Sequence, residues 1–211
     1  MNQNIIKAIV MASKWLYDKE MVNSLEGNIS IKSDGLLYIT PGRVNKSTLS
    51  EKQVCVIDNN DSQIFGSDAP SSELMMHQAV YEIRGGSGAV IHSHPPCLTA
   101  FALCGVPVES RATPEFIAYF GGCIKVAKYG RPGTLEVVED ALRILKEDDI
   151  VLLANHGVLS YGANIEDALN LLEAAEGIAK NLCIARMIGK DIPIPNEEFD
   201  FFLNMYTSRK L

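Results

Sequence analysis

The sequence predicts an α/β fold in which helices cover a mixed, largely antiparallel sheet. Up to residue 65, short alternating segments are separated by turn signals, a pattern typical of β-hairpins. Beyond that point, apolar runs of strand length alternate with longer segments of helical periodicity. With 211 residues, 47% of them hydrophobic, the chain can bury a substantial core. We expect a single domain over residues 1–211, with a C-terminal tail from about residue 197.

The N-terminal part begins with an amphipathic helix and continues with hairpins. Apolar residues recur at helical spacing over residues 2–19, and Asn2 or Asn4 can cap that helix. The expected hairpins pair residues 27–31 with 36–40, and residues 54–57 with 63–65.

A helix is expected next, from Ser71 to about residue 85, and its start has two interpretations. Ser71 is a natural N-cap and Glu73 falls in the first turn, where a carboxylate suits the helix dipole. The same terminus could instead bind a phosphate, with Glu73 supplying a base. The residue pattern alone leaves both interpretations open.

The second half of the chain alternates helices and strands. Thr134 is expected to cap one helix, and Asn164 begins the longest one. The expected elements are a strand at 89–94, a helix at 98–104, a loop after 106–111, a strand at 124–127, a helix at 134–146, strands at 150–154 and 157–161, a helix at 164–189, an extended segment at 192–195 and a helix at 197–206.

Three of the four histidines follow apolar, strand-like runs. His92 and His94 are two residues apart, so on an extended segment they project to the same face. His156 comes after the apolar run at 150–154. Three neutral imidazoles at strand ends could bind a metal and leave a position open for substrate, as catalytic zinc requires. The alternative is that these histidines are hydrogen-bonded at the strand ends and bind nothing.

Composition narrows the function classes. The 19 basic and 26 acidic residues give a net charge of −7, which disfavours binding to nucleic acid or to an anionic membrane. No apolar run approaches the roughly 20 residues of a membrane span, and the N-terminus lacks a secretory pattern. The five cysteines form no CxxC pair, which indicates a reducing compartment, so a cytoplasmic protein is expected. Cys97 lies close enough to the histidines in sequence to be a further candidate ligand.

Five motifs in order resemble the class II aldolase family of L-fuculose-1-phosphate aldolase and L-ribulose-5-phosphate 4-epimerase. They are GNIS at 27–30, ITPG at 39–42, PSSE at 70–73, HSH at 92–94 and NHG at 155–157. The resemblance implies a three-layer α/β/α sandwich and a homotetramer with active sites between neighbouring subunits. It also implies one divalent metal per subunit, usually zinc with manganese or cobalt as alternatives, held by His92, His94 and His156.

The same resemblance assigns phosphate binding to polar residues of the first three motifs. These residues are Asn28, Thr40, Gly42, Ser71 and Ser72. Hydroxyls and amides can bind an oxyanion without much positive charge, which suits an acidic protein. Arg43 or Lys46 could add charge there, although solvated surface is the plainer interpretation of both.

Glu73 matches the acid/base carboxylate of the aldolases, whereas the epimerases usually carry aspartate at that place. His77, one helical turn later, can pack or orient the site. The catalytic tyrosines of fuculose-phosphate aldolase have no clear counterparts. Glu115 occupies one of those places, and Tyr119 and Tyr206 lie near them in sequence.

The resulting hypothesis is a metal-dependent aldehyde-lyase. It would reversibly cleave a ketose 1-phosphate, either L-fuculose 1-phosphate or a related deoxyketose phosphate, to dihydroxyacetone phosphate and an aldehyde. A methylthioribulose-1-phosphate dehydratase or a sugar-phosphate epimerase of the same fold is the alternative. A noncatalytic, adducin-like interaction module is a third, which the three histidines and Glu73 disfavour.

Overall fold

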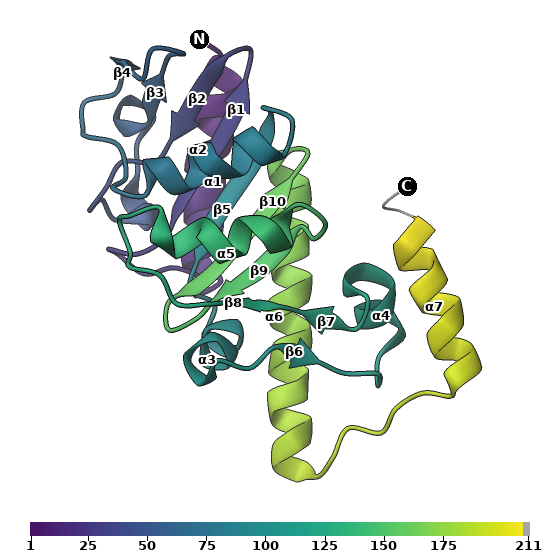
Figure 1. Ribbon diagram of the computed structural model, residues 1–211. Coiled ribbons are helices and arrows are strands. Elements are labelled where there is room, and N and C mark those ends of the chain that lie inside the picture. Colours follow the sequence, from purple (N-terminus) through teal and green to yellow (C-terminus); the bar gives the residue numbers. More distant parts are fainter. Residues whose placement is uncertain (209–211) are drawn as a thin grey trace.

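The computed structural model describes residues 1–208 and is built around an eight-stranded sheet (Figure 1). Every neighbouring pair in this sheet is antiparallel except β8 with β9. From one edge to the other, the strands are β4 (Gln63–Phe65), β3 (Cys55–Ile57), β2 (Leu36–Ile39), β1 (Asn28–Ser33), β5 (Gly88–Ser93), β10 (Gly157–Gly162), β9 (Ile150–Leu153) and β8 (Val126–Ala127).

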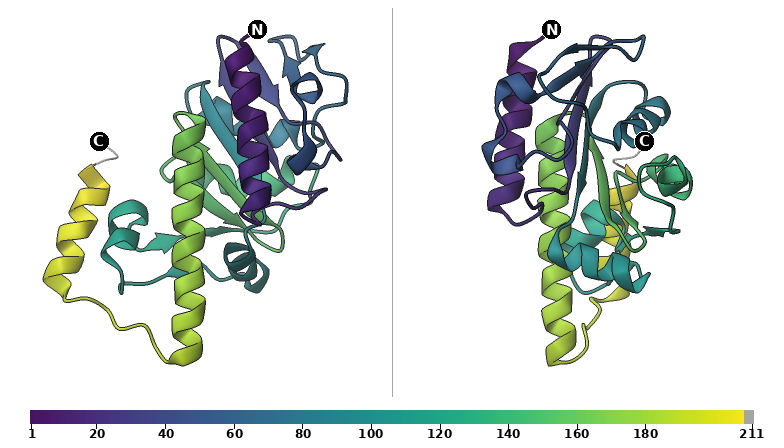
Figure 2. Two further views of the ribbon diagram at one scale, coloured as in Figure 1. Left: turned by 180° about the vertical axis from the view of Figure 1, so that it is seen from behind. Right: turned by 90° about the vertical axis from the view of Figure 1, so that its left-hand side faces the viewer.

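Helices cover both faces of the sheet, as Figure 2 shows. Helices α1 (Gln3–Asp18) and α6 (Ile165–Ile188) pack on one face, and α2 (Leu74–Ile83) and α5 (Glu136–Leu145) pack on the other. The three-layer α/β/α arrangement with a mixed, largely antiparallel sheet is therefore confirmed. Within residues 1–208, no helix combines the length and the apolar character needed to cross a bilayer.

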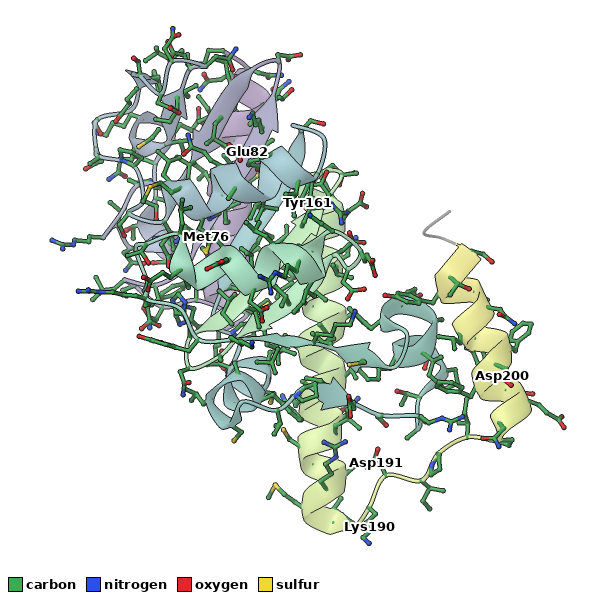
Figure 3. The ribbon with its side chains drawn as sticks, viewed as in Figure 1. Met76, Glu82, Tyr161, Lys190, Asp191 and Asp200 are labelled. Carbon is green, nitrogen blue, oxygen red and sulfur yellow. The ribbon has the colours of Figure 1, made fainter. Side chains whose placement is uncertain are left out.

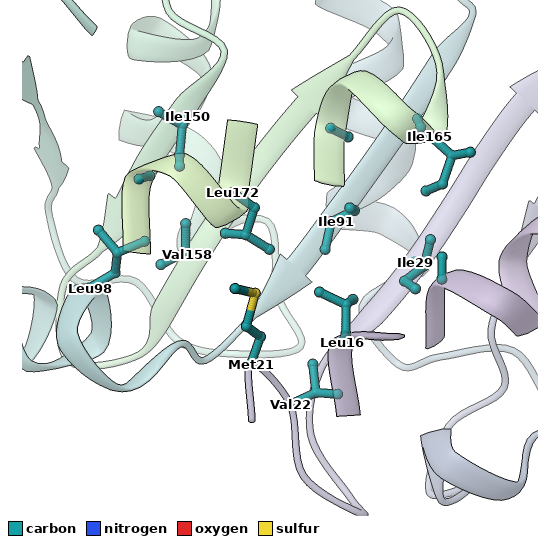
Figure 4. Packing of buried hydrophobic residues seen from close by; sticks show 14 of the residues in the cluster. Leu16, Met21, Val22, Ile29, Ile91, Leu98, Ile150, Val158, Ile165 and Leu172 are labelled. Carbon is teal, nitrogen blue, oxygen red and sulfur yellow. The ribbon is translucent and has the colours of Figure 1, made fainter. Parts of the chain in front are cut away.

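Strand β5 lies in the middle of the sheet, and all six of its residues are buried. Successive side chains enter opposite cores, as the pleat of a strand requires. Ile91 packs in the core beneath α1 and α6, together with Ile29 and Leu172 (Figure 4), whereas Val90 packs in the core beneath α2 and α5.

Elements outside the main sheet form a projection at one end of the molecule. The strands β6 (Val108–Glu109) and β7 (Cys123–Ile124) make a second, two-stranded sheet, and α4 (Pro114–Phe120) connects them. Helix α7 (Asn196–Ser208) packs against α4 and stands apart from the eight-stranded sheet (Figure 1). Residues 209–211 of the predicted tail lie outside the described part of the chain.

Several local predictions are confirmed, and others are wrong. Of the two candidate caps Asn2 and Asn4, it is the Asn2 side chain that caps α1, and the Asn164 side chain caps α6 as expected. Thr134 does not cap α5, because its hydroxyl donates to the carbonyl of Arg131 and the helix begins at Glu136. The expected strand at 124–127 is divided, because the chain passes from the small sheet to the large one at this point.

Two short elements complete the fold near the site. The 3-10 helices η1 (Lys46–Thr48) and η2 (Glu51–Gln53) connect β2 to β3, and both contact α1.

Helix α3 (Pro96–Cys104) begins two residues after His94. Its first turn is held from α6, because the carboxylate of Glu176 accepts the backbone N–H groups of Cys97 and Leu98, each at 2.9 Å.

Glu176→Ala should therefore destabilise the protein, since two N–H groups at a helix start would lose a charged acceptor. We expect a loss of about 2 kcal/mol or more in the free energy of unfolding, measured by urea denaturation. Glu173→Ala is the matched control on the same helix. Its partner is the exposed Lys19, at 3.0 Å, and such surface ion pairs contribute less than about 1 kcal/mol. Equal losses in the two variants would contradict the anchoring role of Glu176.

Candidate metal and catalytic site

The candidate site lies where β1, β5 and the turn before β10 meet. Asn28 at the start of β1 is directly opposite His92 near the end of β5, and Leu159 of β10 is opposite His92 on the other side. His94 follows the end of β5, where its backbone N–H donates to the carbonyl of Met21 at 2.8 Å. The strand register therefore brings residues from distant parts of the sequence together at one place.

His156 lies in the tight turn between β9 and β10. Asn155, the residue before it, has a φ of 56°, a left-handed conformation that asparagine tolerates better than most residues. Gly157 follows, and a Cβ atom there would lie 2.6 Å from the carbonyl oxygen of Ser93 and 2.8 Å from the ring of His94. Only glycine lets this turn approach the end of β5 closely enough to present His156 to the other two histidines.

The three imidazoles face one another. One ring nitrogen from each of His92, His94 and His156 lies within 4.8 Å of the other two. The Nε2 atoms of His92 and His94 are 3.0 Å apart. The sequence prediction that these side chains converge therefore agrees with the geometry.

The hydrogen bonds and burial of the triad suit a divalent metal ion. The Nδ1 of His92 donates to the carbonyl of Val158 at 3.0 Å, so its Nε2 carries a lone pair toward the other rings. Burial lowers the pKa of all three histidines, and repulsion from neighbouring histidines lowers those of His92 and His94 further. Neutral rings with converging lone pairs repel unless a cation lies between them, so the donor set fits a metal.

Glu73, just before α2, completes the cluster. One carboxylate oxygen lies 3.5 Å from the Nε2 of His92, and the other lies 3.6 Å from the Nε2 of His156. The side-chain amide of Asn28 donates to Glu73 at 2.6 Å. The prediction that Ser71 caps α2 is wrong, because the helix begins only at Leu74. The Ser71 hydroxyl instead accepts the backbone N–H of Glu73 in the turn before the helix. This turn fixes the backbone of Glu73 beside the triad.

A series of buried hydrogen bonds orients the side chain of Asn28. His77 Nε2 contacts the side-chain oxygen of Asn28, the Nδ1 of His77 lies 2.7 Å from the hydroxyl of Ser30, and that hydroxyl lies 2.8 Å from the phenol of Tyr81. Because an amide oxygen only accepts, Nε2 must carry the His77 proton, and Nδ1 must accept from Ser30. The Ser30 oxygen is then free to accept from Tyr81. Each donor in this series of hydrogen bonds, from Tyr81 to Asn28, therefore points toward Glu73.

The sequence suggested an orienting role for His77 but gave no sign of Ser30 or Tyr81. These partners belong to β1 and α2, which are far apart in sequence. Ser30 lies two residues after Asn28 on the same strand face, and Tyr81 lies one helical turn after His77. In the sequence, only these two spacings indicate that Ser30 and Tyr81 lie near the site.

A pocket of about 760 Å³ opens from the triad. Four of the residues assigned to phosphate binding line it, namely Asn28, Gly42, Ser71 and Ser72. Thr40 does not, because it is fully buried and its hydroxyl accepts the N–H of Ile29 at 3.2 Å. The N–H of Gly42 donates to the carbonyl of Ala69 at 3.2 Å. The phosphate assignments of these residues stay predictions.

Two cationic residues, Arg43 and Lys46, also line the pocket. Lys46 is only 3% exposed, so its interpretation as solvated surface is wrong. Nothing in the sequence marks Lys46 as buried, because a lone lysine beside a turn is usually solvent-exposed. Its burial follows from the packing of η1 against α1.

Other candidates from the sequence lie elsewhere. Tyr119 and Tyr206 line a small cavity between α4, α7 and Asp148, where the Tyr206 hydroxyl donates to the Asp148 carboxylate at 2.8 Å. Glu115 is in the first turn of α4. Cys97 is not part of the histidine triad, and burial, with Glu176 nearby, raises the pKa of its thiol to about 11. Within one chain, these four side chains do not line the pocket.

The chain is similar to known proteins over most of its length. Residues 7–183 match the family described as the class II aldolase and adducin N-terminal domain. The L-fuculose phosphate aldolase of Methanococcus vannielii is 34% identical over 175 residues, which cover 83% of this chain and 93% of that protein. The 5-deoxy-D-ribulose 1-phosphate aldolase of Bacillus thuringiensis serovar kurstaki is 30% identical over 191 residues, which cover 87% and 89% of the two chains. A solved L-fuculose 1-phosphate aldolase structure has a TM-score of 0.86 and 28% identity, and the match covers 98% of both chains.

The buried His77 predicts a specific pH dependence of stability. Burial, with repulsion from His92, lowers the pKa of His77 to about 3 in the folded protein, against about 6.5 in an unfolded chain. Between these values the unfolded state binds more protons, so the free energy of unfolding rises with pH. His77→Gln keeps a donor for Asn28 but cannot titrate.

The variant should therefore lose stability less steeply than the wild type as pH falls below about 6.5, by up to about 1.4 kcal/mol per pH unit. Urea denaturation at several pH values, with a chelator present for both proteins, measures the difference. Parallel slopes would contradict the assignment of His77 as a neutral, buried group.

Proposed function

Since the chain belongs to the class II aldolase and adducin family, we propose that this aldolase reversibly cleaves a ketose 1-phosphate to dihydroxyacetone phosphate and an aldehyde. The observation that carries the proposal is the meeting of three neutral imidazoles and the Glu73 carboxylate in one pocket. The proposed substrate is L-fuculose 1-phosphate or a related deoxyketose phosphate. The names of the relatives support this class, because they specify L-fuculose phosphate and 5-deoxy-D-ribulose 1-phosphate.

We propose that His92, His94 and His156 hold one divalent ion per chain. Zinc is the first candidate, and manganese and cobalt are alternatives, because imidazole suits several first-row metals. When bound, such an ion would polarise the hydroxyl and carbonyl oxygens of a ketose phosphate. The neutral state of the three rings supports the proposal, because only neutral imidazole can donate a lone pair.

Glu73 is the proposed acid/base. Its carboxylate would take or return the proton on the carbon beside the carbonyl, which becomes the new hydroxymethyl position after cleavage. The hydrogen bond from Asn28 fixes one carboxylate oxygen, so the other oxygen is left to face the substrate. Ser71 and Ser72 present hydroxyls to the same pocket and are proposed to bind the phosphate together with Asn28, Thr40 and Gly42.

The alternatives differ in their products. Dehydration of methylthioribulose 1-phosphate or epimerisation of a sugar phosphate would conserve the carbon skeleton, whereas aldol cleavage yields two fragments. Glutamate at position 73 favours cleavage by resemblance to the aldolases. A noncatalytic, adducin-like role is disfavoured because such a module needs neither the triad nor Glu73.

We further propose a cytoplasmic homotetramer with sites between neighbouring subunits, in which residues 1–211 form one domain with a tail from about residue 197. Helices α4 and α7 project at one end of the molecule, which supports a shared site, because Glu115, Tyr119 and Tyr206 would then approach a neighbour's pocket. Light scattering tests the assembly, and a stable, active monomer would contradict it.

Glu73→Gln should abolish most of the activity without loss of the metal. The amide keeps the size of the side chain but cannot transfer a proton, so we expect turnover to fall at least about 100-fold. A coupled assay for dihydroxyacetone phosphate, run on a panel of ketose 1-phosphates, measures turnover, and elemental analysis checks metal content. Unchanged turnover in this variant would remove Glu73 from the chemistry.

Removal of the metal should abolish activity without unfolding the protein. Dialysis against a chelator is expected to abolish cleavage while the fold persists, because the triad lies at the ends of strands in a sheet with two complete cores. Adding zinc, manganese or cobalt should restore activity, and circular dichroism should show an unchanged fold. Full activity in protein without detectable metal would refute the metal dependence.

A further inference from the structure

The pocket needs more positive charge than its predicted phosphate ligands provide. Besides the neutral histidines, three carboxylates line it, from Glu26, Asp68 and Glu73. The whole chain carries a net charge of −7. A divalent ion at the triad would not balance the three carboxylates, so a phosphate dianion would still be repelled unless further cations lie next to it.

Several donors that could hold the phosphate are buried or already used within the chain. Thr40 is fully buried and does not line the pocket, the Gly42 N–H donates to Ala69, and the Asn28 amide donates to Glu73. The hydroxyls of Ser71 and Ser72 remain as candidate donors, and both are neutral. This leaves Arg43 and Lys46 as the cationic side chains of the pocket lining.

Arg43 occupies a backbone conformation that arginine seldom adopts. Its φ is 57°, in the left-handed region where glycine has no steric penalty. Non-glycine residues in this region destabilise the fold by roughly 1 kcal/mol or more and tend to cluster at ligand sites. Within residues 1–208, its guanidinium forms no ion pair or hydrogen bond that would explain its presence.

Lys46 is unfavourable for a different reason. Its side chain is almost fully buried, and its ammonium donates to the carbonyl of Val44 at 2.9 Å. Burial lowers the pKa of Lys46, and no carboxylate among residues 1–208 pairs with it. A buried ammonium with one neutral acceptor is costly, and an anion in the pocket would compensate it.

We propose that Arg43 and Lys46 bind the phosphate group of the substrate, so that these two residues set the preference of the site for a phosphorylated ketose. The inference rests on the proposed function for the identity of the phosphate ester. It explains why two residues that destabilise the free protein line the same pocket, because the bound anion offsets both penalties.

Two variants remove the charges without straining the fold. Arg43→Gly deletes the guanidinium at a position where glycine suits the backbone, and Lys46→Met keeps the length of the side chain but removes the buried charge. Both proteins should melt at a temperature equal to or above that of the wild type. Lys190→Met is the control, because Lys190 is exposed just beyond the C-terminal end of α6 (Figure 3).

The first measurement is the affinity of the metal-loaded proteins for inorganic phosphate, by isothermal titration calorimetry. The second is KM for the ketose 1-phosphate that the wild type cleaves. Each pocket variant should weaken phosphate binding and raise KM at least about 10-fold, the scale of a hydrogen bond to a charged group. Added salt should weaken phosphate binding less in the variants than in the wild type, and Lys190→Met should behave as the wild type.

The outcomes separate this inference from the proposed function. Unchanged phosphate affinity and KM in both pocket variants would overturn the inference, even if the enzyme cleaves a ketose 1-phosphate. Weaker binding accompanied by a lower melting temperature would also overturn it, because the residues would then be structural. Phosphate binding that needs both cations, in a protein that cleaves no ketose 1-phosphate, would uphold the inference and refute the proposed reaction.

Discussion

The position of β5 between β1 and β10 determines where Asn28, His92 and His94 of the candidate site lie. Ile91 is buried in one core and Val90 in the other, so a slip of one residue would exchange the two sets of side chains. The same slip would turn His92 away from Asn28 and from the triad. The hydrophobic packing of this strand therefore fixes the strand residues of the site, and the turns at Glu73 and at Gly157 bring the other groups to them.

Around this strand lie polar side chains whose burial and close contact destabilise the protein unless a ligand is bound. Burial holds the three histidines neutral while their lone pairs converge beside the Glu73 carboxylate. Lys46, which lines the same pocket, is buried, and no carboxylate among residues 1–208 pairs with it. A cation at the triad and an anion near Lys46 would each relieve one of these costs. A metal and a phosphate ester are ligands of those two kinds, which links the electrostatics of the free protein to the proposed reaction.

Much of this arrangement could be predicted from local patterns in the sequence. The two-residue spacing of His92 and His94 places them on one face of a strand, and an apolar run before His156 indicates another strand end. Asn2 and Asn164 were identifiable as caps because their side chains act within three residues. The motif resemblance then supplied the family, which the comparisons confirm.

What the sequence did not reveal depends on contacts between distant segments. Tyr81 reaches Ser30 across 51 positions, and no pattern at that separation marks the pair. The burial of Lys46 depends on how η1 packs against α1, so a turn residue that looks solvent-exposed becomes part of a pocket lining. Thr134 was misplaced as a cap because its hydroxyl bonds back to Arg131 instead of forward into the helix.

The most direct test of the central claim is hydrogen exchange at dihydroxyacetone phosphate, the half of the reaction that does not depend on the aldehyde. Metal-loaded protein would be incubated with dihydroxyacetone phosphate in D₂O, and loss of the proton signal beside the carbonyl followed by NMR. We expect exchange at a single, stereospecific position in the wild type and very little in Glu73→Gln. No exchange by wild-type protein with metal bound would contradict aldolase chemistry at this site.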